Sequence, residues 1–190
     1  MRLVETVGIL KAGGIGVLPT DTIYGLVGCA LDRKAVERIY VAKKRAPAKP
    51  CIVLISEIAD LQKFGVAPDA ATSAVLRKLW PAPVSIILPC DRADFEYLHR
   101  GTKTLAFRLP ADVGLRELLV GTGPLIAPSA NPEGLSPAKT INEARDYFNG
   151  NVDFYEQGTT HEAPSTLVSI VGGKVSVLRE GSVSIPKEFL

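Results

Sequence analysis

The stretch Pro19-Thr20-Asp21-Thr22-Ile23-Tyr24-Gly25-Leu26 follows directly after the apolar run Ile15–Leu18. That run is short and continuous, as expected of a buried strand. After it, small hydroxyl side chains and a tyrosine interrupt the apolar pattern. Open sheets bind ligands at the ends of their strands, so this position predicts a ligand-binding segment on a layered fold. A tight turn with a packed Tyr24 would select the same residues, and the stretch alone leaves both interpretations open.

A second polar segment, Pro128-Ser129-Ala130-Asn131, follows an apolar run at residues 125–127. It offers a hydroxyl, a carboxamide and backbone N–H groups within one short loop. Ordinary turn chemistry favours the same residue types. The segment is therefore a second candidate for ligand binding.

Strand and helix patterns alternate along most of the chain, and a hairpin pattern comes last. Apolar spacing and capping residues predict helices over residues 2–12, 57–64, 68–79 and 112–119, one after the cap Asp32 and one after the cap Thr140. Short apolar runs predict strands over residues 15–18, 51–55, 84–88, 104–109 and 125–127, and a hairpin of 166–171 and 174–178. This order predicts an α/β (α+β) domain with a mixed sheet and helices packed on it.

Composition excludes several classes of protein. With 190 residues, 46% hydrophobic and 22% charged, the chain has the make-up of one globular domain rather than a disordered or fibrous one. The sequence has no apolar run long enough to span a membrane, and we expect a cytoplasmic protein. Neither a disulfide framework nor a zinc site is indicated by three scattered cysteines, Cys29, Cys51 and Cys90.

The net charge of +2 conceals a basic block at residues 33–49. This block holds one acidic residue, Glu37, and seven basic ones, so its local charge is +6 and the rest of the chain sums to −4. Such a concentration on a near-neutral protein suggests an anion site. Charge alone favours the simpler interpretation, which is a solvated helix face. The basic residues are Arg33, Lys34, Arg38, Lys43, Lys44, Arg45 and Lys49.

Standard nucleotide-binding and nucleophile motifs do not explain the basic block. The sequence contains neither a P-loop nor a complete dinucleotide fingerprint. Ser136-Pro137-Ala138-Lys139 matches the S-x-x-K pattern of acylating serines, but its companion motifs are absent, so a loop is the better interpretation. His99 and His161 have no triad or metal-ligand context, and we expect them to be surface or locally bonded histidines.

Seven motifs nevertheless occur in a characteristic order between about residues 4 and 185. Together they resemble the motif series of the YrdC-like threonylcarbamoyl-AMP synthases. The motifs are Pro19-Thr20-Asp21-Thr22-Ile23-Tyr24-Gly25-Leu26, Lys43-Lys44-Arg45, Trp80-Pro81-Ala82-Pro83, Phe107-Arg108-Leu109-Pro110, Ala127-Pro128-Ser129-Ala130-Asn131, Pro164-Ser165-Thr166 and Leu178-Arg179-Glu180-Gly181.

The resemblance implies one YrdC-type domain over residues 1–190, in the short form of the family, with a twisted mixed sheet and a basic concave cavity. It implies that L-threonine, bicarbonate and ATP give L-threonylcarbamoyl-AMP and pyrophosphate, the first step of threonylcarbamoyladenosine formation at position 37 of tRNA. It also implies a substrate-bridging Mg²⁺ without metal ligands from the protein. The expected partners are the three substrates, the downstream tRNA threonylcarbamoyl-transfer machinery and, through a weak contact, tRNA itself, with no membrane.

The resemblance also assigns site residues, position by position. It makes the substrate itself the nucleophile, because the amine of threonine captures bicarbonate and the carbamate then attacks the α-phosphorus. Catalysis then depends on orientation and charge neutralisation. The residues expected to be catalytic are Lys43, Arg45, Ser129 and Asn131. The residues expected to bind ATP are Arg45, Lys49, Thr104, Ser129, Ala130 and Arg179. The residues expected to bind threonine are Thr22, Tyr24, Arg108 and Ser165.

Three positions depart from the family pattern. Ala46 stands where proline usually follows the arginine, Ala82 replaces a glycine, and Ser169 stands where an aspartate is common. These departures leave open a second hypothesis, in which the chain is a paralogue that binds RNA or nucleotide without turnover. A third hypothesis is carbamoyl transfer, as in the related domain of hydrogenase-maturation proteins, but that domain normally belongs to a much longer chain.

Overall fold

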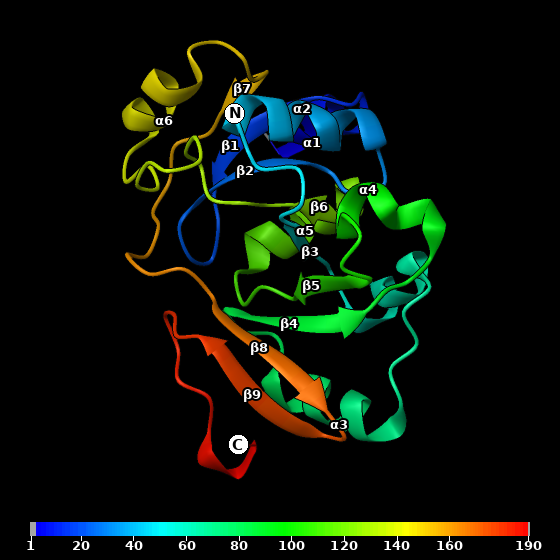
Figure 1. The fold of residues 1–190 in the computed structure, drawn as a ribbon. Coiled ribbons are helices and arrows are strands. Elements are labelled where there is room, and N and C mark those ends of the chain that lie inside the picture. Colours follow the sequence, from blue (N-terminus) through cyan, green and yellow to red (C-terminus); the bar gives the residue numbers. More distant parts are fainter. Residues whose placement is uncertain (1–2, 190) are drawn as a thin grey trace.

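A computed structural model describes residues 3–189 of the chain. Within these residues the strands are β1 (Ile15–Pro19), β2 (Tyr24–Cys29), β3 (Ile52–Leu54), β4 (Val84–Pro89), β5 (Thr104–Arg108), β6 (Leu125–Ile126), β7 (Phe154–Tyr155), β8 (Thr166–Val171) and β9 (Lys174–Arg179). They form one curved sheet in the order β7-β1-β2-β6-β3-β5-β4-β8-β9 (Figure 1). Three pairs are parallel, namely β1 with β7, β3 with β5, and β4 with β8, and the other pairs are antiparallel. The predicted mixed sheet is confirmed.

The helices pack on this sheet. They are α1 (Leu3–Lys11), α2 (Arg33–Lys43), α3 (Ala70–Leu79), α4 (Glu96–His99), α5 (Val113–Thr122) and α6 (Ile141–Phe148), with short 3₁₀ segments η1 (Ile58–Phe64), η2 (Ala93–Phe95) and η3 (Lys187–Phe189). The predicted helix at 57–64 is therefore a 3₁₀ segment, and the sequence patterns missed α4, η2, η3, β2 and β7. None of the helices within residues 3–189 has the length and apolar character that a bilayer crossing demands.

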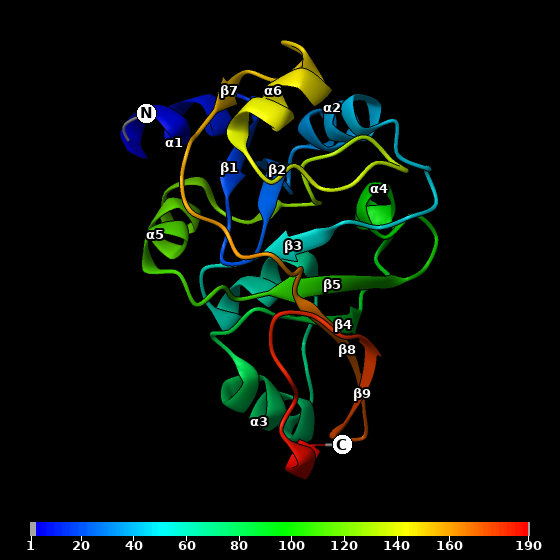
Figure 2. The same cartoon turned by 90° about the vertical axis from the view of Figure 1, so that its left-hand side faces the viewer.

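Two apolar cores lie on opposite faces of the sheet. Strand alternation separates them, because successive side chains point to opposite faces. In β1, Val17 packs into the core beneath α2, whereas Leu18 packs into the core beneath α1 and α5. In β3, Val53 packs into the core beneath α2 and Leu54 into the core beneath α1 and α5. Figure 2 accordingly shows α1 and α5 on one side of β1 and β2 and α2 on the other.

The two ends of α2 are both capped. Asp32 accepts hydrogen bonds from the backbone N–H groups of Lys34 and Ala35, as its position before the helix predicts. At the other end Lys44 has φ 50°, a left-handed conformation that ends the helix. The chain therefore changes direction between Lys43, which ends α2, and Arg45, which lies beyond the turn.

Candidate active site

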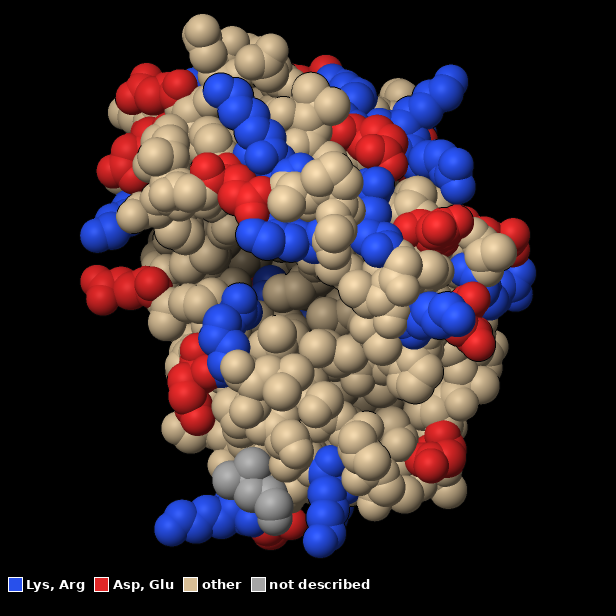
Figure 3. Space-filling model, in the orientation of Figure 1, with Lys and Arg blue, Asp and Glu red and all other residues tan. Residues whose placement is uncertain are grey.

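A large cavity lies over the face of the sheet formed by β3, β5, β4 and β8. It contributes to the hollow near the middle of the face drawn in Figure 3. Its volume is about 1070 Å³, and its walls come from the turn after β1, the segment after α2, the loop 127–139 and the segment 160–165. One acidic side chain, Glu162, lines the cavity together with four basic ones, Arg45, Arg108, Lys139 and Arg179.

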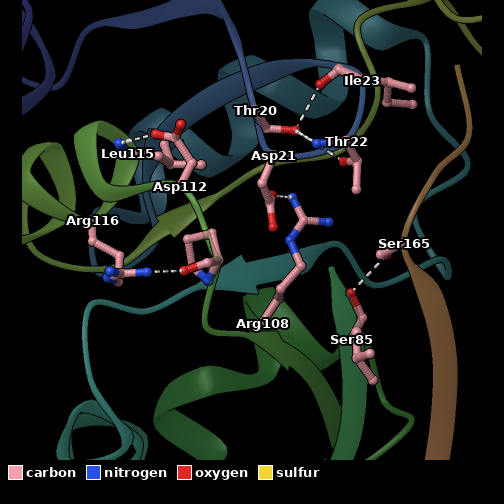
Figure 4. A network of polar contacts seen from close by, with 12 residues as sticks. Thr20, Asp21, Thr22, Ile23, Ser85, Arg108, Asp112, Leu115, Arg116 and Ser165 are labelled. Atoms are coloured by element: carbon pink, nitrogen blue, oxygen red, sulfur yellow. Dashed lines mark hydrogen bonds and ion pairs between the residues drawn. The ribbon is translucent and has the colours of Figure 1, made fainter. Parts of the chain in front are cut away.

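The turn between β1 and β2 forms one wall. The hydroxyl of Thr20 donates to the carbonyl oxygen of Ile23 at 2.7 Å and accepts from the N–H of Thr22 at 3.2 Å (Figure 4). The turn is therefore closed by its own side chain and places Thr22 and Tyr24 on the cavity wall. The tight-turn interpretation of this stretch is confirmed, and the ligand-binding interpretation stays a prediction for a turn that also lines the cavity.

Tyr24 joins this turn to the segment that contains Gly158. Its hydroxyl donates to the carbonyl oxygen of Gly158 at 2.8 Å and accepts from the N–H of Gly158 at 3.2 Å. Both of its usual hydrogen-bonding capacities are therefore occupied within the protein. Tyr24, expected to bind threonine, lies on the wall of the cavity as a link between two loops.

Arg108 ends β5 beneath the same turn. Alternation along β5 points Thr104, Ala106 and Arg108 at the cavity, while the intervening Phe107 is in the core. The guanidinium Nη2 lies 3.0 Å from Oδ1 of Asp21, and both side chains are 4% exposed (Figure 4). Burial lowers the pKa of Arg108 and the charge of Asp21 opposes that shift.

Ser165 and Arg179 complete this end of the cavity. The Ser165 hydroxyl lies 2.8 Å from that of Ser85, and Nη2 of Arg179 donates to the Ser165 carbonyl oxygen at 2.9 Å. The chain after β9 passes so close to β8 that a Cβ at Gly181 would overlap the backbone of residues 164–166. Glycine at this position therefore allows Arg179 to reach Ser165.

Lys43 and Arg45 lie in different surroundings, although the resemblance placed both at the phosphates. Lys43 is 2% exposed and does not line the cavity. Its ammonium donates to the carbonyl oxygens of Ser129 and of Asn131, the latter at 2.5 Å, and so supports the loop from behind. Burial lowers its pKa to about 8, assisted by the charge of Arg45.

Arg45 lies on the cavity wall. Its Nε donates to the carbonyl oxygen of Lys49 at 3.0 Å, and its Nη2 donates to that of Pro50 at 2.9 Å. Lys49 does not line the cavity, because its ammonium pairs with the carboxylate of Glu133. The same carboxylate accepts the N–H of Ala46, and the hydrogen bond from Lys49 is the largest cause of a lowered pKa at Glu133.

The loop 129–131 is divided between the cavity and the protein interior. Ser129 lines the cavity and donates its hydroxyl to Oδ1 of Asn131 at 2.5 Å. Ala130 and Asn131 do not line it. The backbone N–H of Ala130 donates to the backbone carbonyl oxygen of Tyr24. The side-chain amide of Asn131 donates to the carbonyl oxygens of Pro132 and Leu135.

Of the site residues expected from the sequence, the structure thus brings eight to the lining of one cavity, and four do not line it. The eight are Thr22, Tyr24, Arg45, Thr104, Arg108, Ser129, Ser165 and Arg179, and the four are Lys43, Lys49, Ala130 and Asn131. The sequence motifs did not single out Lys139, His161 and Glu162 among the side chains that line the cavity, or Asp21 and Glu133 as partners of site residues.

Comparison with known proteins places this arrangement in a family. The Sua5/YciO/YrdC domain family, described as "Telomere recombination", matches residues 8–181. A threonylcarbamoyl-AMP synthase of Marinobacter nauticus is 34% identical over 170 residues, which cover 86% of this chain and 88% of the relative. A threonylcarbamoyl-AMP synthase of Pyrococcus abyssi is 29% identical over 182 residues, which cover 94% of this chain and 53% of the relative.

The crystal structure of Pyrococcus abyssi Sua5 complexed with L-threonine has the same fold. It matches with a TM-score of 0.84 and 27% identity, over 94% of this chain and 54% of that one. This chain therefore spans about half the length of the Pyrococcus abyssi sequence and structure that it matches. Since the family match runs from α1 to just beyond β9 and includes all the segments that wall the cavity, the chain belongs to the Sua5/YciO/YrdC family.

Proposed function

We propose that this protein is a threonylcarbamoyl-AMP synthase. In the proposed reaction the amine of L-threonine and bicarbonate give a carbamate and water. A carbamate oxygen then bonds to the α-phosphorus of ATP, and the bond from that phosphorus to the departing pyrophosphate breaks. The observation that supports this function best is the single cavity that collects Arg45, Arg108, Ser129 and Arg179 from distant parts of the chain.

The amino-acid end is proposed to lie at Arg108. An arginine fork binds a carboxylate in a bidentate manner and stays charged at working pH. Thr22 and Ser165 line the same cavity and offer hydroxyl groups for the remaining polar atoms of threonine. Tyr24 would shape this end of the cavity, because its hydroxyl is bonded to Gly158.

The nucleotide end is proposed to lie between Arg45, Ser129, Thr104 and Arg179. Arg45 would neutralise negative charge that builds on the phosphates, and Ser129 would orient an oxygen at the reacting centre. Lys43 and Asn131, which lie behind the wall, would act by holding the Ser129 loop. Lys49 would reach the phosphates only after leaving Glu133.

No protein side chain has to form a covalent bond in this scheme. The nucleophile is a substrate oxygen, so the chain's task is to hold three small reactants in line. A magnesium ion carried by the ATP phosphates would add charge neutralisation, and within residues 3–189 no group of three or more His, Cys, Asp or Glu side chains could hold a metal.

The proposed product is an activated threonylcarbamoyl group, which a tRNA-modifying transfer machinery would consume at position 37 of tRNA. Such a step would place the protein in the cytoplasm, with at most a weak tRNA contact of its own.

The test measures pyrophosphate release by the purified protein with each substrate omitted in turn. We expect release that requires ATP, L-threonine and bicarbonate together, and its loss in Arg108→Met. Gly8→Ala, a change on α1 remote from the cavity, is the control. Release that ignores threonine and bicarbonate would refute the proposal, and salt-sensitive RNA binding without turnover would favour the paralogue instead.

A further inference from the structure

Asp21 is a buried carboxylate to which the proposed reaction gives no direct task. Its nearest cation among the described residues is Arg108, with 3.0 Å between Oδ1 and Nη2. Neither carboxylate oxygen has a hydrogen-bond partner in the protein, and Asp21 does not line the cavity. Because an isolated buried carboxylate is costly, the position of Asp21 makes physical sense only as part of a pair with Arg108.

The side chain of Asp21 does not hold the turn in which it lies. The turn is closed by the Thr20 hydroxyl, which bonds to Thr22 and Ile23. The charge of Asp21 is instead directed at the guanidinium, where Figure 4 shows the two side chains facing each other. Its effect should therefore pass through Arg108 rather than through the fold of the turn.

The ion pair also sets the direction of the guanidinium. One terminal nitrogen of Arg108 faces Asp21, and the other points away from it, toward the side where Thr22 and Ser165 lie (Figure 4). The positive charge of Arg179 lies close enough to oppose that of Arg108. Without Asp21, that repulsion and the freedom of the long arginine side chain would both favour other orientations.

We infer that Asp21 is a positioning residue that fixes the Arg108 guanidinium for the carboxylate of the amino-acid substrate. The inference deepens the proposed function and rests on it. Asp21 holds one end of the fork, and the other end is thereby presented beside Thr22 and Ser165. The substrate carboxylate then meets a donor whose direction is set before binding, which reduces the entropy lost on association.

The first experiment compares Asp21→Asn with the parent protein in steady-state pyrophosphate release. We expect the KM for threonine to rise about tenfold or more, since small misplacements of a binding group carry penalties of this size. The KM for ATP should stay within about threefold. Asp112→Asn is the matched control, because Asp112 is an exposed cap of α5 and asparagine caps a helix equally well. Equal losses toward both substrates would indicate a purely structural role and would overturn the inference.

The second experiment tests whether Asp21 acts through Arg108. In an Arg108→Met background, Asp21→Asn should change threonine binding by less than about twofold, because the group it positions is gone. The double variant should also unfold at a higher urea concentration than Arg108→Met alone, since the single change leaves the Asp21 charge buried without a partner. A further loss of threonine binding in the double variant would show that Asp21 acts on the substrate directly. Asp21→Glu keeps the charge, and we expect it to raise the KM for threonine less than Asp21→Asn does.

Calorimetry with L-threonine separates this inference from the proposed function. If the parent protein binds no threonine in the presence of ATP, the proposed function fails. If the parent binds threonine and Asp21→Asn binds it equally well, the function stands and the positioning role fails. The urea experiment reports on the ion pair in either case.

Discussion

The buried ammonium of Lys43 gives a prediction about stability and pH. Opposing effects act on this group, and the charge of Arg45 acts in the same direction as burial. Burial disfavours the charged form, whereas the carbonyl oxygens of Ser129 and Asn131 favour it by accepting its hydrogen bonds. Burial dominates and lowers the pKa from the ordinary 10.5 to about 8. At 2% exposure, solvent screening does little to reduce this effect.

The direction of the pH effect follows from proton binding. Between pH 8 and 10.5 the unfolded chain keeps the Lys43 proton, whereas the folded protein has released it. The free energy of unfolding should therefore rise with pH across this interval. Each pKa unit corresponds to about 1.4 kcal/mol, so the rise is about 3 kcal/mol, most of it before pH 10.

The assay is urea unfolding of the parent and of Lys43→Met at several pH values from 7 to 10. The expected result is that the stability difference between the two proteins shifts in favour of the parent as pH rises. Taking the difference removes the contribution of other titrating groups. Lys34→Met, at an exposed position of the same helix, controls for the substitution itself. A difference that is flat or that falls with pH would refute the reasoning, because the carbonyl oxygens would then outweigh burial.

Three further predictions concern the cavity walls. Tyr24→Phe removes both hydrogen bonds to Gly158, so we expect a stability loss of about 1–2 kcal/mol and faster amide hydrogen exchange in residues 156–162; unchanged exchange would contradict the link. Gly181→Ala should lower the melting temperature and raise the KM for ATP, because the added Cβ would overlap the backbone of residues 164–166. The control Gly8→Ala adds a methyl group in open space on a helix, and we expect its free energy of unfolding to rise by about 0.5–1 kcal/mol. Arg45→Ala should lower kcat/KM for ATP by about 10²–10³-fold in the pyrophosphate assay, and a loss below about threefold would remove Arg45 from the reacting phosphates.

Strand alternation and helix caps could be predicted from the sequence because they depend on local patterns. Strand β2 could not, since Gly25 and Gly28 interrupt its apolar pattern. The structure explains one of these glycines through tertiary packing. A Cβ at Gly28 would lie 3.0 Å from a methyl carbon of Ile15 and 3.1 Å from one of Ile39, so glycine lets β2 and α2 approach closely. That requirement arises from residues distant in sequence.

The position of Lys43 shows a different limit. Its place in a K-x-R motif suggested that it faces the phosphates beside Arg45. Helical spacing carried the correct signal, because Val36, Ile39 and Lys43 fall on one face of α2 and the first two are core residues. The left-handed cap at Lys44 then turns Arg45 toward the cavity. Two neighbouring cations therefore have different surroundings and different expected roles.

The basic residues of the whole block at residues 33–49 likewise differ in their surroundings. Lys43 is buried behind a loop, Lys49 pairs with Glu133, and Arg38 pairs with Asp153. Of the seven basic side chains in the block, only Arg45 lies on the described cavity wall.

The cavity acquires its other positive charges from β5, from the loop before α6 and from the end of β9, through Arg108, Lys139 and Arg179. Because these groups come together only when β4, β5 and β8 pair, the charge of the cavity is a product of the fold rather than of the local sequence. It follows that destabilising the pairing of β4 with β8 should weaken nucleotide binding even when every cation is retained.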